Sequence, residues 1–204
     1  MMRRAISRSL GRVARPARRV ATAFSRRVRR ARAARDRQLL REQPELDATD
    51  LRMMRRALRL AAGAATRGEV PIAAVVWRER DGAIEILAEA ANDREASGDP
   101  TGHAEIVALR RAGERLGSWR LTGCSMAVTL EPCPMCAGAL VNARLDRCVF
   151  GASDPKAGAC GTLYRIAEDP RLNHRVTVVG GVLAEESVAL LRRFFRERRG
   201  RRQP

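Results

Sequence analysis

Long hydrophobic segments are absent from this sequence of 204 residues. The longest run of apolar residues is Val70–Trp77, whereas a helix that crosses a membrane needs about 20 consecutive apolar residues. We therefore expect no membrane-spanning helix and no membrane partner. No continuous apolar stretch follows the first Arg residues either, which argues against a secretory signal peptide.

Lysine and aromatic side chains are also scarce. Lys156 is the only lysine, and the aromatic residues are two Trp, one Tyr and four Phe. The formal net charge is nevertheless +17, because residues 1–45 contain fifteen Arg against three acidic residues. That leaves a net charge of +5 for residues 46–204. Arg forms forked hydrogen bonds to phosphate and stacks on bases, so this charge is compatible with a polyanionic partner.

Residues 1–49 form an Arg-rich extension that we expect to be disordered. The first 35 residues contain no acidic side chain, and apolar residues recur every three or four positions between the Arg residues. Such a pattern is typical of an organellar transit peptide and equally of an arm that binds nucleic acid, although Pro16 interrupts it. A third interpretation is that translation starts at Met53 or Met54. The expected location is cytoplasmic, or plastid or mitochondrial if the extension is a transit peptide.

Residues 50–204 show the regular patterns of one folded domain. Apolar residues at helical spacing alternate with short β-type runs and turn signals such as Asp81-Gly82. Asp50 is a possible N-cap for the first helix. The order of elements predicts an α/β fold with helices layered on one mixed sheet. We expect helices at residues 51–67, 101–115, 132–144 and 183–199, and strands at 69–77, 84–90, 125–131, 147–152 and 174–182.

The five cysteines do not suggest a disulfide framework, because their number is odd. Cys133 and Cys136 form a C-x-x-C pair at the start of a predicted helix, where free N–H groups favour thiolates. A redox pair is one interpretation, and a structural Cys₄ site would need two more spaced thiols. His103 offers a third ligand, and one His, two Cys and a water molecule make a reasonable catalytic zinc shell. The remaining cysteines stand singly and are interpreted as buried apolar side chains: Cys124, Cys148 and Cys160.

Glu105 stands two residues after His103 and gives the site a proton carrier. A carboxylate beside a metal-bound water can take its proton and pass it to a leaving group. The segments "HAE" at 103–105 and "PCPMC" at 132–136 match the H-x-E…P-C-x-x-C signature of zinc deaminases. Each half is weak alone, but in this order and each at the start of a predicted helix they are specific.

From about Met53 to the C-terminus the chain resembles the bacterial tRNA-specific adenosine deaminases, which make inosine at the wobble position. The resemblance is carried by "GEVPIAAVV", "DPTGHAEIVALR", "TLEPCPMCAGALVNARLDRCVFGASDPKAGACG", "NHRVTVVGGVLAEES" and "ALLRRFFRERR". It implies a cytidine-deaminase-like three-layer α-β-α sandwich around a mixed sheet of about five strands. It also implies a homodimer, one zinc ion per subunit and an anticodon stem-loop substrate, from an arginine tRNA with an ACG anticodon.

The resemblance also implies roles for individual residues. His103, Cys133 and Cys136 would be zinc ligands, and Glu105 the catalytic proton shuttle. Substrate-binding positions would be Asn92 on purine nitrogen 7, Val70 and Pro71 as a wall of the base pocket, the backbone N–H of Ala104 near the reacting groups, and Asp154 on the nucleotide. The RNA-binding candidates on the C-terminal helix are Arg192, Phe195, Arg196 and Arg199.

The sequence departs from the family pattern at a few positions. Ala73 replaces a common Gly, Ser153 stands where some members carry Arg, and the first hairpin is several residues longer. Asn92 and Asp154 are also typical turn residues, so each has a plain structural interpretation. None of these departures falls within the zinc signature.

Two other functions are compatible with the sequence. A free-base or nucleoside deaminase that acts on guanine or cytosine would share the zinc signature. A non-catalytic RNA-binding subunit would also resemble the family, but such a subunit does not need Glu105. The basic C-terminal helix favours a tRNA substrate over a free base.

Overall fold

The computed structural model describes residues 16–200, with side chains from residue 27 onward. The chain divides into two compact units, Met1–Pro44 and Glu45–Pro204. In the first unit, α1 (Pro16–Glu42) is one continuous helix, and Pro16 is its first described residue. The apolar positions before Pro16 lie outside the described residues, and the separation of residues 1–49 from the domain stays a prediction.

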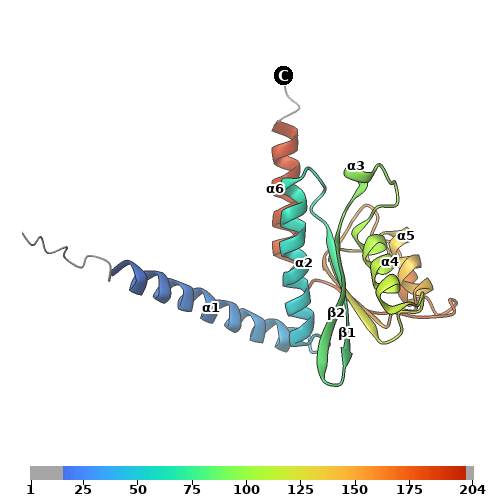
Figure 1. Cartoon of the computed structure of the whole chain (residues 1–204), viewed down its shortest axis with the longest axis horizontal. Helices are drawn as coiled ribbons and strands as arrows, with labels where there is room; N and C mark the ends of the chain where they lie inside the picture. Colours follow the sequence, from blue (N-terminus) through green and yellow to red (C-terminus); the bar gives the residue numbers. More distant parts are fainter. Residues whose placement is uncertain (1–15, 201–204) are drawn as a thin grey trace, which may run out of the picture. The chain divides into compact units, whose positions relative to one another are not determined.

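The second unit is built on one five-stranded sheet with the order β2-β1-β3-β4-β5 (Figure 1). Pairing is antiparallel between β2 and β1 and between β1 and β3, and parallel from β3 to β4 and from β4 to β5. The sheet is therefore mixed, as the sequence predicts. The strands are β1 (Ala73–Arg80), β2 (Ala83–Ala91), β3 (Cys124–Leu130), β4 (Arg147–Ala152) and β5 (Thr177–Val179).

Helices cover both faces of this sheet, which confirms the three-layer α/β fold (Figure 1). The helices α2 (Ala48–Thr66) and α6 (Ala184–Gly200) pack on one face. The helix α4 (Ala104–Leu116) packs on the other, and α5 (Pro134–Asn142) lies beside α4 and contributes to the same core cluster. Between β2 and α4 lies the short helix α3 (Arg94–Ser97), and the 3₁₀ turn η1 (Ile166–Glu168) precedes β5.

Successive side chains of β1 point to opposite faces of the sheet, so they pack alternately against the two helical layers. Ala74 and Val76 belong to the core cluster that contains the small residues of α4, namely Ala104, Ala108 and Ala112. Val75 and Trp77, also buried, point to the opposite face. The alanines allow α4 to lie close to the sheet, and this fixes the position of its first residues.

The start of α2 differs from the sequence prediction. Asp47, not Asp50, is the N-cap, and Asp50 stands three residues later in a reciprocal capping box. Asp50 is then available to Arg147 of β4, whose Nη2 donates to its Oδ2 at 2.7 Å. The prediction was wrong because a second aspartate three residues earlier also fits the cap. The contact between Asp50 and Arg147 gave no signal in the local sequence, because the two residues are far apart in the chain.

No helix among the described residues is long and apolar enough to span a membrane.

Candidate metal centre and active site

Three side chains with metal-binding chemistry meet at the N-terminal ends of α4 and α5. His103 is the N-cap residue of α4, Cys133 is the N-cap residue of α5, and Cys136 lies in the first turn of α5. The Nδ1 atom of His103 lies 3.6 Å from the Sγ atom of Cys133 and 3.5 Å from that of Cys136. All three candidate ligand atoms lie within 4.8 Å of one another, so the residues that the sequence singled out come together as a site that could hold a metal ion.

The local sequence explains how these residues reach the cluster. Pro134 occupies the first helical turn after Cys133, and its fixed φ favours the start of α5 there. Gly102 precedes His103 where a Cβ atom would lie only 3.0 Å from the backbone oxygen of Asp93. A larger residue at this position would push the loop away, so the glycine allows the chain to turn tightly into α4.

The two thiols have opposite pKa shifts. The hydrogen bond with Cys136 and then the contact with His103 lower the pKa of Cys133 to about 4. The same contact with Cys133, followed by burial, raises the pKa of Cys136. The hydrogen bond with Cys133 also raises the pKa of His103. Cys133 is therefore poised as a thiolate beside an imidazole, the form in which it binds a cation.

Glu105 is buried beside this cluster on the first turn of α4. Its side chain is only 4% exposed, and burial raises the pKa of its carboxyl group. Its Oε2 atom has no hydrogen-bond partner among the described residues. Glu69 Oε2 shares this feature, so it is the position of Glu105 beside His103 and Cys136 that marks it for chemistry or for a ligand.

Asn92 lies between the end of β2 and the start of α4. It is 7% exposed, and its Oδ1 accepts a hydrogen bond from the backbone N–H of Ala104 at 3.0 Å. The family resemblance places this N–H near the substrate, whereas in the structure it binds Asn92. Val70 and Pro71 precede β1, with Pro71 buried and Val70 half-buried.

Two buried glutamates around the cluster have no predicted role from the sequence. Glu69 is 3% exposed and accepts hydrogen bonds from the backbone N–H groups of Glu95 and Ala96, which fixes α3. Glu131 is 2% exposed and accepts hydrogen bonds from the loop that contains Asp154. Their only sequence signal is position: each charged residue stands at the edge of an apolar run.

Asp154 itself forms a turn. Its Oδ1 accepts from the N–H of Lys156 at 2.9 Å, and its backbone oxygen accepts from the N–H of Gly158 at 2.9 Å. The turn interpretation therefore applies, and it leaves the second carboxylate oxygen for another contact.

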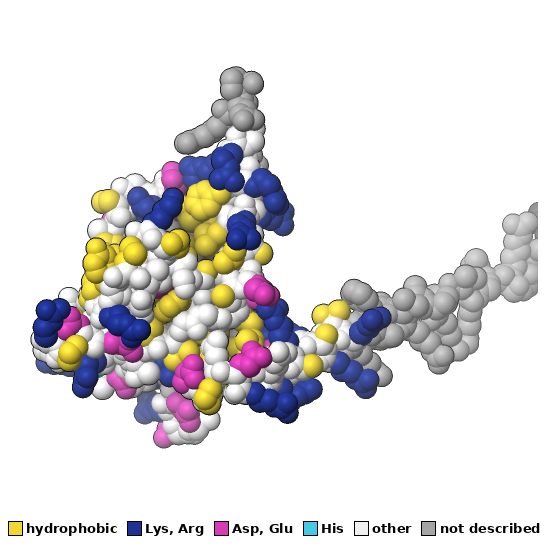
Figure 2. Space-filling view, turned by 180° about the vertical axis from the view of Figure 1, so that it is seen from behind, with side chains coloured by type: hydrophobic (Ala, Val, Ile, Leu, Met, Phe, Trp, Pro, Cys, Tyr) yellow, Lys and Arg dark blue, Asp and Glu magenta, His cyan; other side chains and the backbone are white. Residues whose placement is uncertain are grey.

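The four RNA-binding candidates of α6 share one exposed face. Arg192, Phe195, Arg196 and Arg199 are all exposed, and their spacing places them in a single stripe. Phe194 packs inward at 7% exposure, whereas Phe195 is 42% exposed. Figure 2 shows basic side chains gathered near the C-terminal end of α6, with hydrophobic side chains between them. Arg198 contacts Glu95 at 3.4 Å, so this end of α6 lies beside α3, which precedes the loop that leads to His103.

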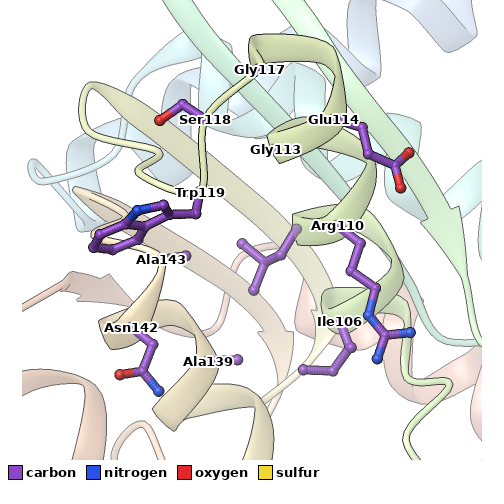
Figure 3. A pocket seen from close by; sticks show the side chains of 11 residues that line it. Ile106, Arg110, Gly113, Glu114, Gly117, Ser118, Trp119, Ala139, Asn142 and Ala143 are labelled. Atoms are coloured by element: carbon purple, nitrogen blue, oxygen red, sulfur yellow. The ribbon is translucent and has the colours of Figure 1, made fainter.

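An open groove of about 880 Å³ lies on the outer side of α4 and α5 (Figure 3). Ile106, Leu109 and Ala139 form part of its lining, and Trp119 stands at its edge with 58% of its surface exposed. The groove is distinct from the metal cluster, because the cluster residues are not among those that line it.

Comparison with known proteins agrees with this site. The family described as MafB19-like deaminase matches residues 48–199. The tRNA-specific adenosine deaminases of Bacillus subtilis and Haemophilus influenzae are each 46% identical over 150 residues, which cover 74% of this chain and 91% and 85% of those proteins.

Solved structures give the same result. A structure from studies of A-to-I editing by tRNA:A34 deaminases is 41% identical with a TM-score of 0.63, covering 69% of this chain and 99% of that one. A guanine deaminase from Nitrosomonas europaea is more distant, at 27% identity and a TM-score of 0.59, covering 73% and 85%. The resemblance drawn from the sequence is confirmed: this chain belongs to the family of tRNA-specific adenosine deaminases.

Proposed function

We propose that this chain is a hydrolase that converts the wobble adenosine of a tRNA anticodon loop to inosine. The observation that carries the proposal is buried Glu105 beside His103, Cys133 and Cys136, in a chain 46% identical to tRNA-specific adenosine deaminases. In the overall reaction, water supplies the oxygen that replaces the exocyclic amino group, and ammonia is released.

The three-residue cluster fits one zinc ion per subunit. Sulfur and nitrogen ligands of a tetrahedral zinc ion are about 3.5 Å apart, because Zn–S is about 2.3 Å and Zn–N about 2.0 Å. The distances from His103 Nδ1 to the two sulfur atoms are 3.6 and 3.5 Å. Zinc would lower the pKa of a water molecule and make it nucleophilic near neutral pH. Two thiolates and one imidazole would leave one tetrahedral position for that water.

Glu105 would move the protons of the reaction. The carboxylate would take one proton from the attacking water and pass it to purine nitrogen 1 as the C–O bond forms. It would then move the hydroxyl proton of the adduct to the amino nitrogen, so that the C–N bond breaks and ammonia leaves. Burial raises the pKa of Glu105, and a raised pKa makes a carboxylate a better proton acceptor.

The residues around the cluster would hold the base. Asn92 already uses its Oδ1 for Ala104, and its NH₂ group would donate to purine nitrogen 7. Ala104 would therefore act through Asn92 as well as through its closeness to the reacting atoms. Val70 and Pro71 would form the apolar wall of the pocket, and Asp154 would contact the nucleotide.

The exposed stripe of α6 would bind the RNA backbone. Arg192, Arg196 and Arg199 would neutralise phosphates, and Phe195 between them would offer an apolar surface for a base or ribose. The target base has to leave its stack to reach a buried carboxylate, and this costs least in a single-stranded loop.

A homodimer is part of the proposal, with the groove between α4 and α5 as the contact. Its apolar lining and exposed Trp119 suit a second copy of the chain better than open solvent. Trp119→Arg should convert dimers to monomers in analytical ultracentrifugation, whereas Glu79→Arg on the exposed β1–β2 hairpin should not. A wild-type monomer at micromolar concentration would contradict this part.

A substrate panel tests the activity and its alternative. The candidates are anticodon stem-loops with A34, including the arginine ACG sequence, and free adenosine, guanine and cytosine. The similarity to a guanine deaminase makes guanine the necessary comparison. We expect inosine only in the RNA, and most in the arginine stem-loop. Turnover of guanine with none of any stem-loop would overturn the proposal in favour of a free-base deaminase.

We propose the cytoplasm as the place of action, or an organelle if residues 1–49 direct import. Fusing residues 1–49 to a fluorescent protein distinguishes the two.

A further inference from the structure

One loop, residues 153–162, connects β4 to the segment before η1 and lies against the start of α5. The backbone N–H of Ala159 donates to the oxygen of Pro132 at 2.8 Å, directly beside Cys133. Because Pro132 directly precedes Cys133, a shift in the position of this loop would be passed to the start of α5.

The loop is held by Glu131, which follows β3. Glu131 Oε1 accepts from the backbone N–H groups of Cys160 at 3.1 Å and Thr162 at 2.9 Å. Its Oε2 accepts from the N–H of Asp154 at 3.0 Å and from the hydroxyl group of Thr162. One buried carboxylate thus binds both ends of the loop, at Asp154 and at Thr162.

The burial and the hydrogen bonds of Glu131 indicate that its side chain holds the loop in place. The carboxylate is 2% exposed, and all four donors are neutral groups of the loop, whose hydrogen bonds offset the cost of burying its charge. Gly158 lies so close that a Cβ atom there would stand 2.4 Å from Glu131 Oε2. The loop can therefore pack this closely on Glu131 only with a glycine at position 158.

We propose that Glu131 is a positioning residue that fixes loop 153–162 for binding of the nucleotide chain beside the target base. It acts through Asp154, whose backbone it holds, and it takes no part in the chemical step. This inference rests on the proposed function for its effect on RNA, but not for its effect on the loop.

The single lysine of the chain allows a direct test on the zinc-loaded full-length protein. Lys156 is exposed and lies within the loop, so a protease that cleaves only after lysine has one site in the chain. Glu131→Gln places an NH₂ group where Oε2 accepts from the N–H of Asp154. Two hydrogen-bond donors would then face each other, and the bond that holds the loop is lost. We expect cleavage at Lys156 to become faster by about tenfold or more, because cleavage follows the population of the open loop.

A second pair of variants, with a smaller change, tests the same contact in case Glu131→Gln does not fold. Thr162→Val removes only the hydroxyl donor to Glu131, whereas Thr162→Ser keeps it. Cleavage should be faster in Thr162→Val and close to wild type in Thr162→Ser. Equal cleavage rates in all folded variants, at unchanged melting temperature, would overturn the proposal.

Steady-state kinetics on the anticodon stem-loop give the second readout. With zinc content unchanged, Glu131→Gln and Thr162→Val should raise KM by a larger factor than they lower kcat. A fall in kcat alone, or loss of zinc in step with activity, would also overturn it. If even the wild type leaves the stem-loop unmodified, the proposed function fails, and the cleavage series still decides whether Glu131 holds the loop.

Discussion

Glu105 combines burial with a position beside a candidate metal site, and its oxygen Oε2 has no partner among the described residues. Glu105→Gln keeps the size of the side chain but cannot carry a proton. We expect zinc content and stem-loop affinity to stay unchanged and the single-turnover rate to fall by a factor of about 10² to 10⁴. Metal analysis, a binding titration and rapid-mixing kinetics check the three parts.

A matched control for this change is Glu79→Gln, an exposed glutamate at the end of β1. It should have wild-type kinetics. A near-normal single-turnover rate for Glu105→Gln would show that another group moves the proton.

The five cysteines should divide into two groups when metal is measured. Cys133→Ala and Cys136→Ala should each lose most of the zinc, since a catalytic zinc site needs three protein ligands. Cys124 is buried in β3 away from the cluster, and burial raises the pKa of its thiol to about 11. Cys124→Ala should therefore keep about one zinc per chain, and full occupancy in a Cys133→Ala/Cys136→Ala protein would refute the ligand set.

At the scale of elements, a buried ion pair joins α2 to β4. Asp50 is 1% and Arg147 is 23% exposed, and their charged atoms lie 2.7 Å apart. Arg147→Met would leave Asp50 buried without its counter-charge. We expect a loss of about 3 kcal/mol in the free energy of unfolding, measured by urea denaturation.

The control for this prediction is an exposed pair. Arg165 is 75% exposed and contacts Glu168 at 3.4 Å, so Arg165→Met should cost less than about 1 kcal/mol. Equal losses for the two variants would mean that the Asp50–Arg147 contact contributes little.

The basic stripe of α6 makes a prediction about salt. Each phosphate contact releases counterions, with a slope of about −0.7 per contact for single strands. Changing Arg192, Arg196 and Arg199 to Ala should therefore weaken stem-loop binding and flatten log Kd against log salt by about two units. Turnover at saturating RNA should change much less, because the stripe lies outside the metal cluster.

The control variant loses the same charge at another place, by changing Arg80, Arg111 and Arg115 to Ala. These three residues are exposed near the end of the hairpin and along α4, away from α6. Parallel salt slopes for wild type and the α6 variant would mean that this helix does not touch RNA.

The local elements were predictable because their signals are local. The C-x-x-C pair, the Pro that starts α5 and the alternation of β1 each act within a few residues. The structure brings His103 and Cys133 together from thirty positions apart, which zinc-ligand chemistry and the family signature anticipated but local spacing did not. Glu131 and Glu69 gave no such signal, because their hydrogen bonds reach loops that lie twenty or more positions further along the chain. The sequence predicted a strand from residue 69, but β1 begins at Ala73. The cause is again a distant contact, because Glu69 accepts hydrogen bonds from α3 instead of entering the sheet.

At the scale of the whole molecule, the second unit carries the candidate metal cluster and the exposed basic stripe of α6. The metal cluster lies where α4 and α5 begin, and the contact of Arg198 with Glu95 brings the end of α6 to α3. If α6 binds RNA as proposed, the contact of Arg198 with Glu95 means that the bound RNA would lie beside α3.

The boundary of the catalytic unit gives a prediction at the same scale. The sequence places it after residue 49, whereas the compact unit begins at Glu45. Residues 45–47 belong to the fold: the oxygen of Glu45 accepts from Arg147 at 2.6 Å, Leu46 is 6% exposed, and Asp47 caps α2. We therefore expect deletion of residues 1–44 to leave the melting temperature and the kcat on a stem-loop unchanged.

Deletion of residues 1–49 should also give a folded, active enzyme, but a less stable one. Loss of the cap and of buried Leu46 should cost about 3 kcal/mol, or about 10 °C in melting temperature for a domain of this size. Equal melting temperatures for the two deletions would place the boundary at residue 49 after all.

The shorter deletion also separates the interpretations of the extension. If the Arg residues of α1 form an RNA-binding arm, full-length tRNA should bind the 45–204 protein more weakly at low salt and with a flatter salt slope. Identical binding curves would leave the extension without a part in RNA recognition.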